Sequence, residues 1–136
     1  MGSMANYLEN EILDHISTFG AAFTPTGTLW MALFTVKPTD SSGSGTEVAG
    51  TGYTRAKFSN SSNTWSVAAA GAIENVAEIA FPSAGAGGWG SVVGFAMFTN
   101  SNSGNCYYWA SLTTSKTVNS GDTAKFATGD IDITLD

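Results

Sequence analysis

The chain has 136 residues, of which 43% are hydrophobic and 12% aromatic, so it is long and apolar enough to bury the core of one domain. Charged residues make up only 12%, and the formal net charge is −6. The five Lys and Arg residues are scattered, and they form no basic stripe that would neutralise phosphates. No apolar run reaches the roughly 18 residues of a membrane span. We therefore expect neither a nucleic-acid partner nor a membrane partner.

The N-terminal segment "NYLENEILDHISTFG" predicts the only helix. Five apolar residues recur in it at helical spacing: Leu8, Ile12, Leu13, Ile16 and Phe19. Asn6 is the expected cap and Gly20 the expected stop. We interpret residues 1–3 ("MGS") as an added sequence or an alternative start, and residues 4–24 as an N-terminal helix or arm. Its apolar stripe must pack on the domain or on a neighbour.

Residues 25–136 predict a single all-β domain, an antiparallel β-sandwich or jelly roll. Residues 28–36 ("TLWMALFTV") are apolar on both faces, which indicates a central strand covered from both sides. Further strands are expected at 53–58, 75–81, 91–98, 106–112, 123–128 and 130–135, with an ambiguous segment at 65–68. The last two of these strands should pair with each other across "GD".

A Ser/Gly/Thr-rich loop is expected over residues 37–52. At about 16 residues it is longer than most connections, and such loops are usually functional or mobile. We expect it to contact a neighbouring subunit.

The stretch "GAGGWG" matches G-x-G-x-x-G, the pattern of dinucleotide-binding turns. That site requires a helix after the last glycine, because the helix N-terminus holds the pyrophosphate. Here "SVVGFAMF" follows and predicts a strand, and no acid occurs between Gly90 and Asp122. The glycines are therefore predicted to form a turn, with positive φ on both sides of Trp89. No cofactor is expected.

Catalytic and metal-binding patterns are weak, so no enzyme, catalytic residue or metal site is predicted. His15 lies alone in the helix, and Cys106, the only cysteine, excludes an internal disulfide and is expected to be buried. Asp130 and Asp132 share one face of the final strand. Such a pair can bind calcium or serve hydrolysis, but alternating acids are also the usual solvated face of an edge strand.

Aromatic and apolar residues are the candidates for an interaction surface. Trp65 and Trp89 lie near loops, and Tyr107, Tyr108 and Trp109 are consecutive. Such side chains stack on sugars, form subunit contacts or simply fill the core. The interface candidates are Leu8, Ile12, Ile16, Phe19, Trp65, Trp89, Tyr107 and Trp109.

Several segments carry a resemblance to a family. "MANYLENEILDHI", "LWMALFTVKPTD", "TEVAGTGYTR", "WGSVVGFAMF" and the final "YYWASLTTSKTVNSGDTAKFATGDIDITLD" resemble small structural proteins of tailed bacteriophages. The resemblance spans residues 4–136, carries no active-site motif and implies a place on the surface of the virion.

Two roles are compatible with this resemblance. The first is a capsid decoration (cement) protein, a trimer or dimer that binds the major capsid protein or other virion proteins without chemistry. A low-charge surface suits that role, because few ions are desolvated on packing. The alternative is a tail-fibre or head-fibre module that recognises host surface polysaccharide through Trp65, Trp89 and Trp109.

Overall fold

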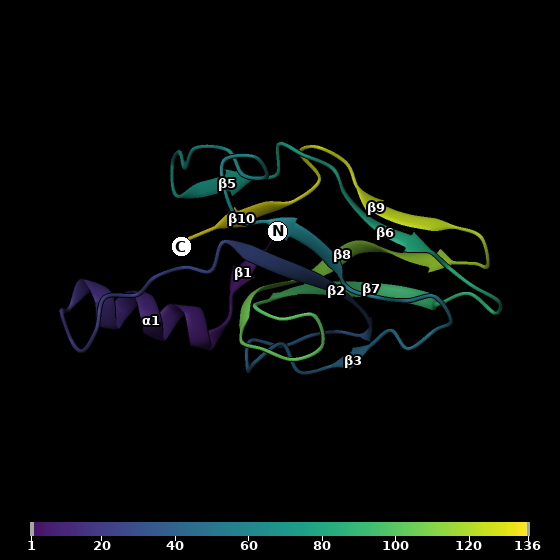
Figure 1. Cartoon of the computed structure of the whole chain (residues 1–136), viewed down its shortest axis with the longest axis horizontal. Helices are drawn as coiled ribbons and strands as arrows, with labels where there is room; N and C mark the ends of the chain where they lie inside the picture. Colours follow the sequence, from purple (N-terminus) through teal and green to yellow (C-terminus); the bar gives the residue numbers. More distant parts are fainter. Residues whose placement is uncertain (1, 136) are drawn as a thin grey trace.

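Two layers of antiparallel β-structure face each other in the computed structural model, which describes residues 2–135, and one helix projects from their side (Figure 1). The main sheet has the strand order β1-β8-β7-β2-β3, and β4 also pairs with β2. Its strands are β1 Ser3–Met4, β2 Thr28–Val36, β3 Thr46–Glu47, β4 Ala56–Ser59, β7 Gly90–Phe98 and β8 Cys106–Val118. The second layer contains two pairs, β5 Ala72–Glu74 with β10 Asp132–Thr134, and β6 Ile79–Ser83 with β9 Thr123–Phe126. The predicted all-β sandwich with one short helix is confirmed.

Strand β2 is the centre of the main sheet, as its apolar sequence predicts. It pairs with β7 on one side and with β3 and β4 on the other. Because side chains alternate between the faces of a strand, Met31 and Leu33 enter the core between the layers, whereas Ala32 and Phe34 enter a second, smaller core on the outer face. Both faces of β2 are therefore covered.

The long loop, residues 37–52, covers the outer face of the main sheet. A Cβ added at Gly43 would lie 3.0 Å from the Cys106 Sγ and 3.0 Å from the Phe98 ring, so the loop backbone packs directly on this second core. The backbone N–H of Asn6 donates to the Asp40 carbonyl at 3.2 Å. The loop includes strand β3 and packs on its own domain, and no contact with a neighbouring subunit is needed to explain its length.

The helix α1, Asn6–Ile16, differs from the expected one at both ends. Ala5 is the N-cap residue, and Asn6 makes no side-chain capping hydrogen bond. The helix ends at Ile16, because Thr18 has a φ of 57°. Phe19 therefore lies beyond the helix, in the segment that returns to β2.

Gly2 and Ser3, which lie outside the predicted domain, take part in its pairing. Ser3 pairs with Trp109 in the main sheet, and the Gly2 N–H donates to the Asp132 carbonyl at 2.7 Å. These contacts connect the main sheet with β10 of the second layer. No helix within residues 2–135 is long and apolar enough to cross a membrane.

The expected hairpin between the last two strands is wrong: β9 pairs with β6, and β10 pairs with β5. The turn between them is held by Asn75, whose side chain is fully buried. Its Nδ2 donates to the Ala127 carbonyl at 2.8 Å, and its Oδ1 accepts from the Ile131 N–H at 2.9 Å. The ambiguous segment at 65–68 forms no strand and contributes one bridge, between Trp65 and Asn75.

Candidate functional site

Two of the candidate tryptophans are core residues. Trp89 is 4% exposed, and its Nε1 donates to the Thr51 carbonyl at 3.0 Å. Trp65 is 8% exposed and donates to the Asn60 Oδ1 at 3.0 Å. Gly88 and Gly90, with φ of 66° and 77°, flank Trp89 as predicted and let the chain turn around it. Neither indole presents a face to solvent, so sugar stacking on these two rings is not supported by their geometry.

The other aromatic candidates fasten the N-terminal segment and the long loop to the main sheet. Tyr107 is buried, stacks on Tyr7 of α1 and contacts Phe23 in the returning segment. Trp109 is half-buried, and its Nε1 donates to the Asp40 Oδ1 at 3.3 Å. Burial raises the pKa of Tyr107, so its hydroxyl stays protonated.

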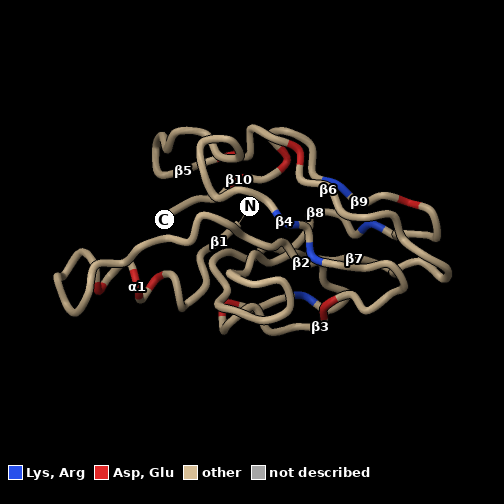
Figure 2. Tube along the Cα trace, viewed as in Figure 1, with Lys and Arg blue, Asp and Glu red and all other residues tan. Residues whose placement is uncertain are grey.

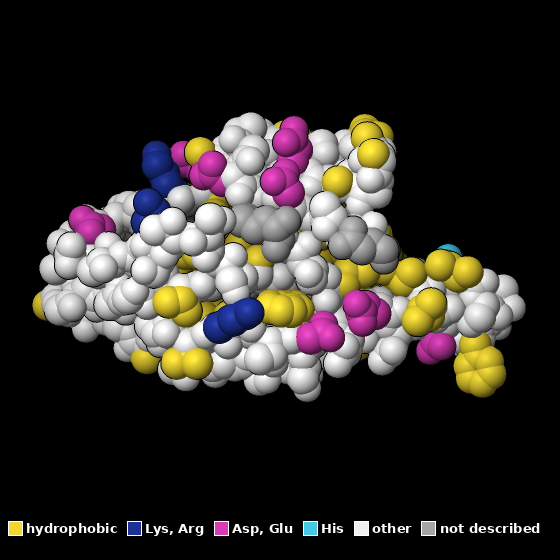
Figure 3. Space-filling model, turned by 180° about the vertical axis from the view of Figure 1, so that it is seen from behind, with side chains coloured by type: hydrophobic (Ala, Val, Ile, Leu, Met, Phe, Trp, Pro, Cys, Tyr) yellow, Lys and Arg dark blue, Asp and Glu magenta, His cyan; other side chains and the backbone are white. Residues whose placement is uncertain are grey.

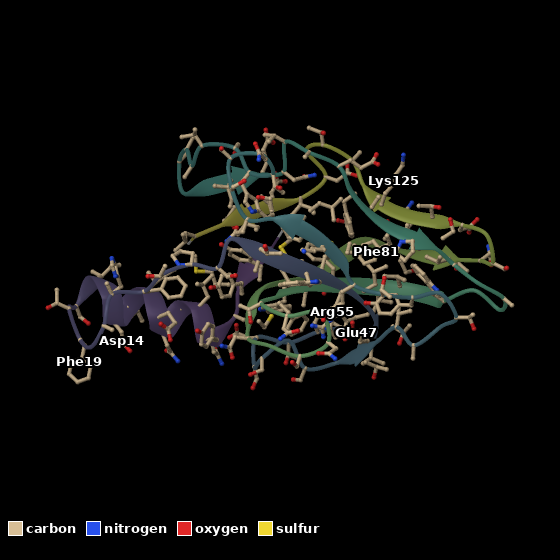
Figure 4. The ribbon with its side chains drawn as sticks, in the orientation of Figure 1. Asp14, Phe19, Glu47, Arg55, Phe81 and Lys125 are labelled. Carbon is tan, nitrogen blue, oxygen red and sulfur yellow. The ribbon has the colours of Figure 1, made fainter. Side chains whose placement is uncertain are left out.

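The arm, predicted over residues 4–24, comprises residues 5–27 in the structure and contacts the body only near its base. Leu8 is 3% exposed and belongs to the main core, and Ile12 packs on its edge. Farther along, Ile16 is 71% exposed and Phe19 is 77% exposed. Figure 4 shows Asp14 and Phe19 at the far end, with the Phe19 ring pointing away from the sheets. The helical stripe is thus half inside the core and half uncovered.

An apolar groove of about 430 Å³, here called the notch, lies where the arm meets the body. The apolar side chains that line it are Met4, Ile12, Leu13, Ile16 and Leu135. Leu13 is 63% exposed and Leu135 is 61% exposed. Figure 3 shows hydrophobic side chains along the arm and in the recess beside it.

A second concavity, here called the cleft, lies between β8 and β9 and has a volume of about 600 Å³. It owes its shape to an irregular register: Val92 opposes Lys116 and Gly94 opposes Ser111, so two steps along β7 span five along β8. Such a bulge pushes the extra residues out of the ladder. Val92 and Phe126 line the cleft together with exposed Thr113, Thr114 and Lys116.

The cleft and the arm differ in charge (Figure 2). Lys116 and Lys125 line the cleft together with Asp122 and Asp130, which gives it a mixed charge. Both carboxylates also accept a backbone N–H, that of Asn119 for Asp122 and that of Ala127 for Asp130, at 2.9 and 2.8 Å.

The arm carries three acids and lacks Lys and Arg altogether. The acids are Glu9, Glu11 and Asp14, and the first Lys of the chain is Lys37. Residues 17–27, which form the far end of the arm and its return to the body, contain no Asp, Glu, Lys or Arg.

The candidate catalytic residues His15 and Cys106 do not form a reactive cluster. The His15 Nδ1 accepts from the Phe23 N–H at 3.2 Å, within the arm. Cys106 is 1% exposed, and burial raises the pKa of its thiol to about 12. Across residues 2–135 no three His, Cys, Asp or Glu side chains come together in a group that would hold a metal ion.

A protein-family model described as podophage GP4 fiber I protein gp80 matches residues 3–134. The chain belongs to this family. It is therefore a tailed-phage virion structural protein, as the sequence resemblance implied, and its place is in the virion particle. No curated protein matches the chain in a sequence comparison.

Sequence reasoning missed the cleft and the role of Asn75 in this fiber family member. The expected strand ends at Leu112, yet β8 continues through "TTSKT" to Val118, and this extension forms one side of the cleft. The threonines at 113, 114 and 117 were the available signal, because β-branched residues favour strands.

Proposed function

We propose that this chain is a fibre protein of a tailed-bacteriophage particle that recognises a glycan on the host surface. The match to a fiber protein family over residues 3–134 carries the proposal. It favours the fibre role over capsid decoration. The fibre is a homo-oligomer attached to other virion proteins, and no catalytic step or cofactor is assigned to it.

We assign the glycan to the cleft. A saccharide presents hydroxyl groups around apolar ring faces, and a matching site combines a few polar groups with an apolar wall. Thr113 and Thr114 supply hydroxyls that donate and accept, Lys116 supplies a charged donor, and Phe126 supplies an apolar surface. The end of β8 and strand β9, which border the cleft, lie at the end of the body opposite the arm (Figure 1), so the cleft stays free when the arm contacts another protein.

Antibody labelling of intact particles in the electron microscope tests the fibre role. Gold particles at the tail or on projecting fibres support it. Dense labelling over the capsid surface would overturn it in favour of decoration.

Binding of polysaccharide extracted from susceptible host cells tests the cleft. We expect Lys116→Ala and Thr114→Val each to weaken binding about tenfold, the order expected for a lost hydrogen bond of roughly 1.4 kcal/mol. Lys57→Ala is the matched control, because Lys57 is an exposed lysine on β4, outside the cleft. Equal binding by all variants would reject the cleft and leave the fibre role to be judged by labelling.

A further inference from the structure

The outer part of the arm exposes apolar side chains that no other part of the folded chain covers. Four side chains on and beside it, Leu13, Ile16, Phe19 and Leu135, are 61–77% exposed. Together they expose on the order of 500 Å², which matches the largest apolar patch of a typical monomer and is more than half of one partner's share in a standard interface.

The helix also lacks the length to be stable without packing. It has 11 residues, and an isolated helix shorter than about 12–15 residues is marginal in water. Leu8 and Tyr7 hold its first turns on the body, but its last turn carries Leu13 and Ile16 into solvent. A partner that covers this last turn therefore stabilises the helix as well as burying apolar area.

The same arm carries a projecting apolar group and a hollow of similar chemistry. Phe19 projects at the far end, and the notch lies nearer the base, between α1 and the end of β10. The notch is about 430 Å³, which accommodates a phenyl side chain with its neighbours. A surface with both halves of a contact is self-complementary, the requirement for an interface between identical chains.

Charge also favours a second copy. Each copy has a net charge of −6, so most of its surface repels another copy. Residues 17–27 are the exception, because they include no Asp, Glu, Lys or Arg, and among residues 2–135 Glu9 is the one charged residue that lines the notch. Insertion of Phe19 thus places a segment without Asp, Glu, Lys or Arg against the notch.

We propose that the arm joins copies of this chain, with Phe19 and Ile16 of one copy inserted into the notch of another between Leu13 and Leu135. The contact is the joint of the homo-oligomeric fibre proposed above, and it rests on that proposal only for its biological setting. Because the arms exchange, each copy both supplies a far end and receives one.

Sedimentation of the purified full chain over a range of concentrations tests the joint. We expect a concentration-dependent oligomer for the wild type, and monomer for Phe19→Asp and for Leu135→Asp. Both substitutions are at exposed positions, and circular dichroism verifies that the variants are folded. Val67→Asp is the matched control, since Val67 is 91% exposed and lies outside the arm and the notch, and it should assemble like the wild type. A wild type that stays monomeric throughout, or a Phe19→Asp variant that still assembles, overturns the proposal.

Cross-linking identifies the contact itself. Phe19→Cys and Thr134→Cys proteins are purified separately, mixed and oxidised; Thr134 lines the notch, and the native Cys106 is buried and does not compete. We expect a disulfide-linked dimer in the mixture and little in either protein alone. Cross-linking of Phe19→Cys with itself at the rate of the mixture would show a tip-to-tip contact and reject insertion. These results are independent of labelling on the particle, so the joint and the fibre role fail separately.

Discussion

Arg55 and Glu47 form a two-pronged ion pair that fixes the edge of the main sheet. The Arg55 Nη2 lies 2.8 Å from the Glu47 Oε2, and the Arg55 Nε lies 2.9 Å from the Oε1. The remaining Nη1 donates to the carbonyls of Asn100 and Ser103, both at 2.9 Å, and the guanidinium lies 4.1 Å from the centre of the Phe98 ring. Figure 4 shows the pair beneath the sheet. One side chain therefore connects β3, the turn after β7 and the outer core.

Replacing this arginine by lysine is expected to be costly although the charge is kept. The Arg55 side chain is only 7% exposed, and an ammonium cannot reproduce the planar fork that serves Glu47 and two carbonyls. We expect Arg55→Lys to lower the free energy of unfolding by about 2–3 kcal/mol, measured by urea denaturation. The exposed pair of Lys125 with Glu78 provides the comparison, and Lys125→Ala should change stability by less than about 1 kcal/mol. Equal losses at both sites would contradict the structural role of Arg55.

The buried amide of Asn75 is expected to be as sensitive. It donates to the carbonyls of Ala77 and Ala127 and accepts from the Ile131 N–H. Asn75→Asp removes both donors and places a carboxylate against two carbonyls, so we expect a loss of about 3 kcal/mol or more at pH 7. Because protonation relieves the buried charge, the loss should shrink at pH 4. Thermal unfolding at both pH values checks this, and a loss that does not depend on pH would argue against a buried carboxylate.

The sequence predicts the parts of the fold that depend on local patterns. Apolar runs identify β2 and β7, and helical spacing identifies α1. The glycine turn around Trp89 follows from the absence of a helix pattern after Gly90. In each case the physical cause lies within a few neighbouring residues.

Long-range pairing could not be predicted in the same way. The turn after β9 looks like a hairpin, but Asn75 bonds to residues 52 and 56 positions away and directs the chain to β5. The notch likewise forms only when Leu135 reaches the side of α1, and the cleft depends on the register of β7 with β8. The notch and the cleft arise from the topology of the fold, so no local sequence pattern predicts them.

Two adjacent glycines provide a test that separates backbone strain from collision. Gly87 has a φ of +87° and open space around its missing Cβ, so Gly87→Ala should cost about 1 kcal/mol from strain alone. Gly88 has a φ of +66°, and an added Cβ would lie 2.5 Å from the Val118 carbonyl. That carbonyl accepts the Trp89 N–H at 2.8 Å, so Gly88→Ala should cost about 3 kcal/mol and expose the indole. Urea denaturation followed by tryptophan fluorescence measures both, and equal costs would show that the contact is absent.

The buried thiol of Cys106 predicts how stability changes in alkaline solution. Burial raises its pKa from an ordinary 9.0 to about 12, so the native chain keeps a proton that the unfolded chain loses near pH 9. The native state then binds more protons than the unfolded state between these values, and stability falls as pH rises through that window. Below pH 9 the contribution is fully present.

Comparison with Cys106→Ala isolates this effect from the smaller core volume of the variant. Between pH 8.5 and pH 10 the wild type should lose about 1 kcal/mol more stability than Cys106→Ala, because only its unfolded state gains a thiolate. Burial also raises the pKa of Tyr53 and Tyr108, whose ordinary value is 10.0, so the comparison stops at pH 10, and these tyrosines are present in both proteins. Urea denaturation at four pH values measures the difference, and parallel curves for the two proteins would mean that the native thiol ionises as readily as the unfolded one. A thiol reagent gives an independent check, since the native protein should react slowly at pH 8.5 and the urea-unfolded protein rapidly.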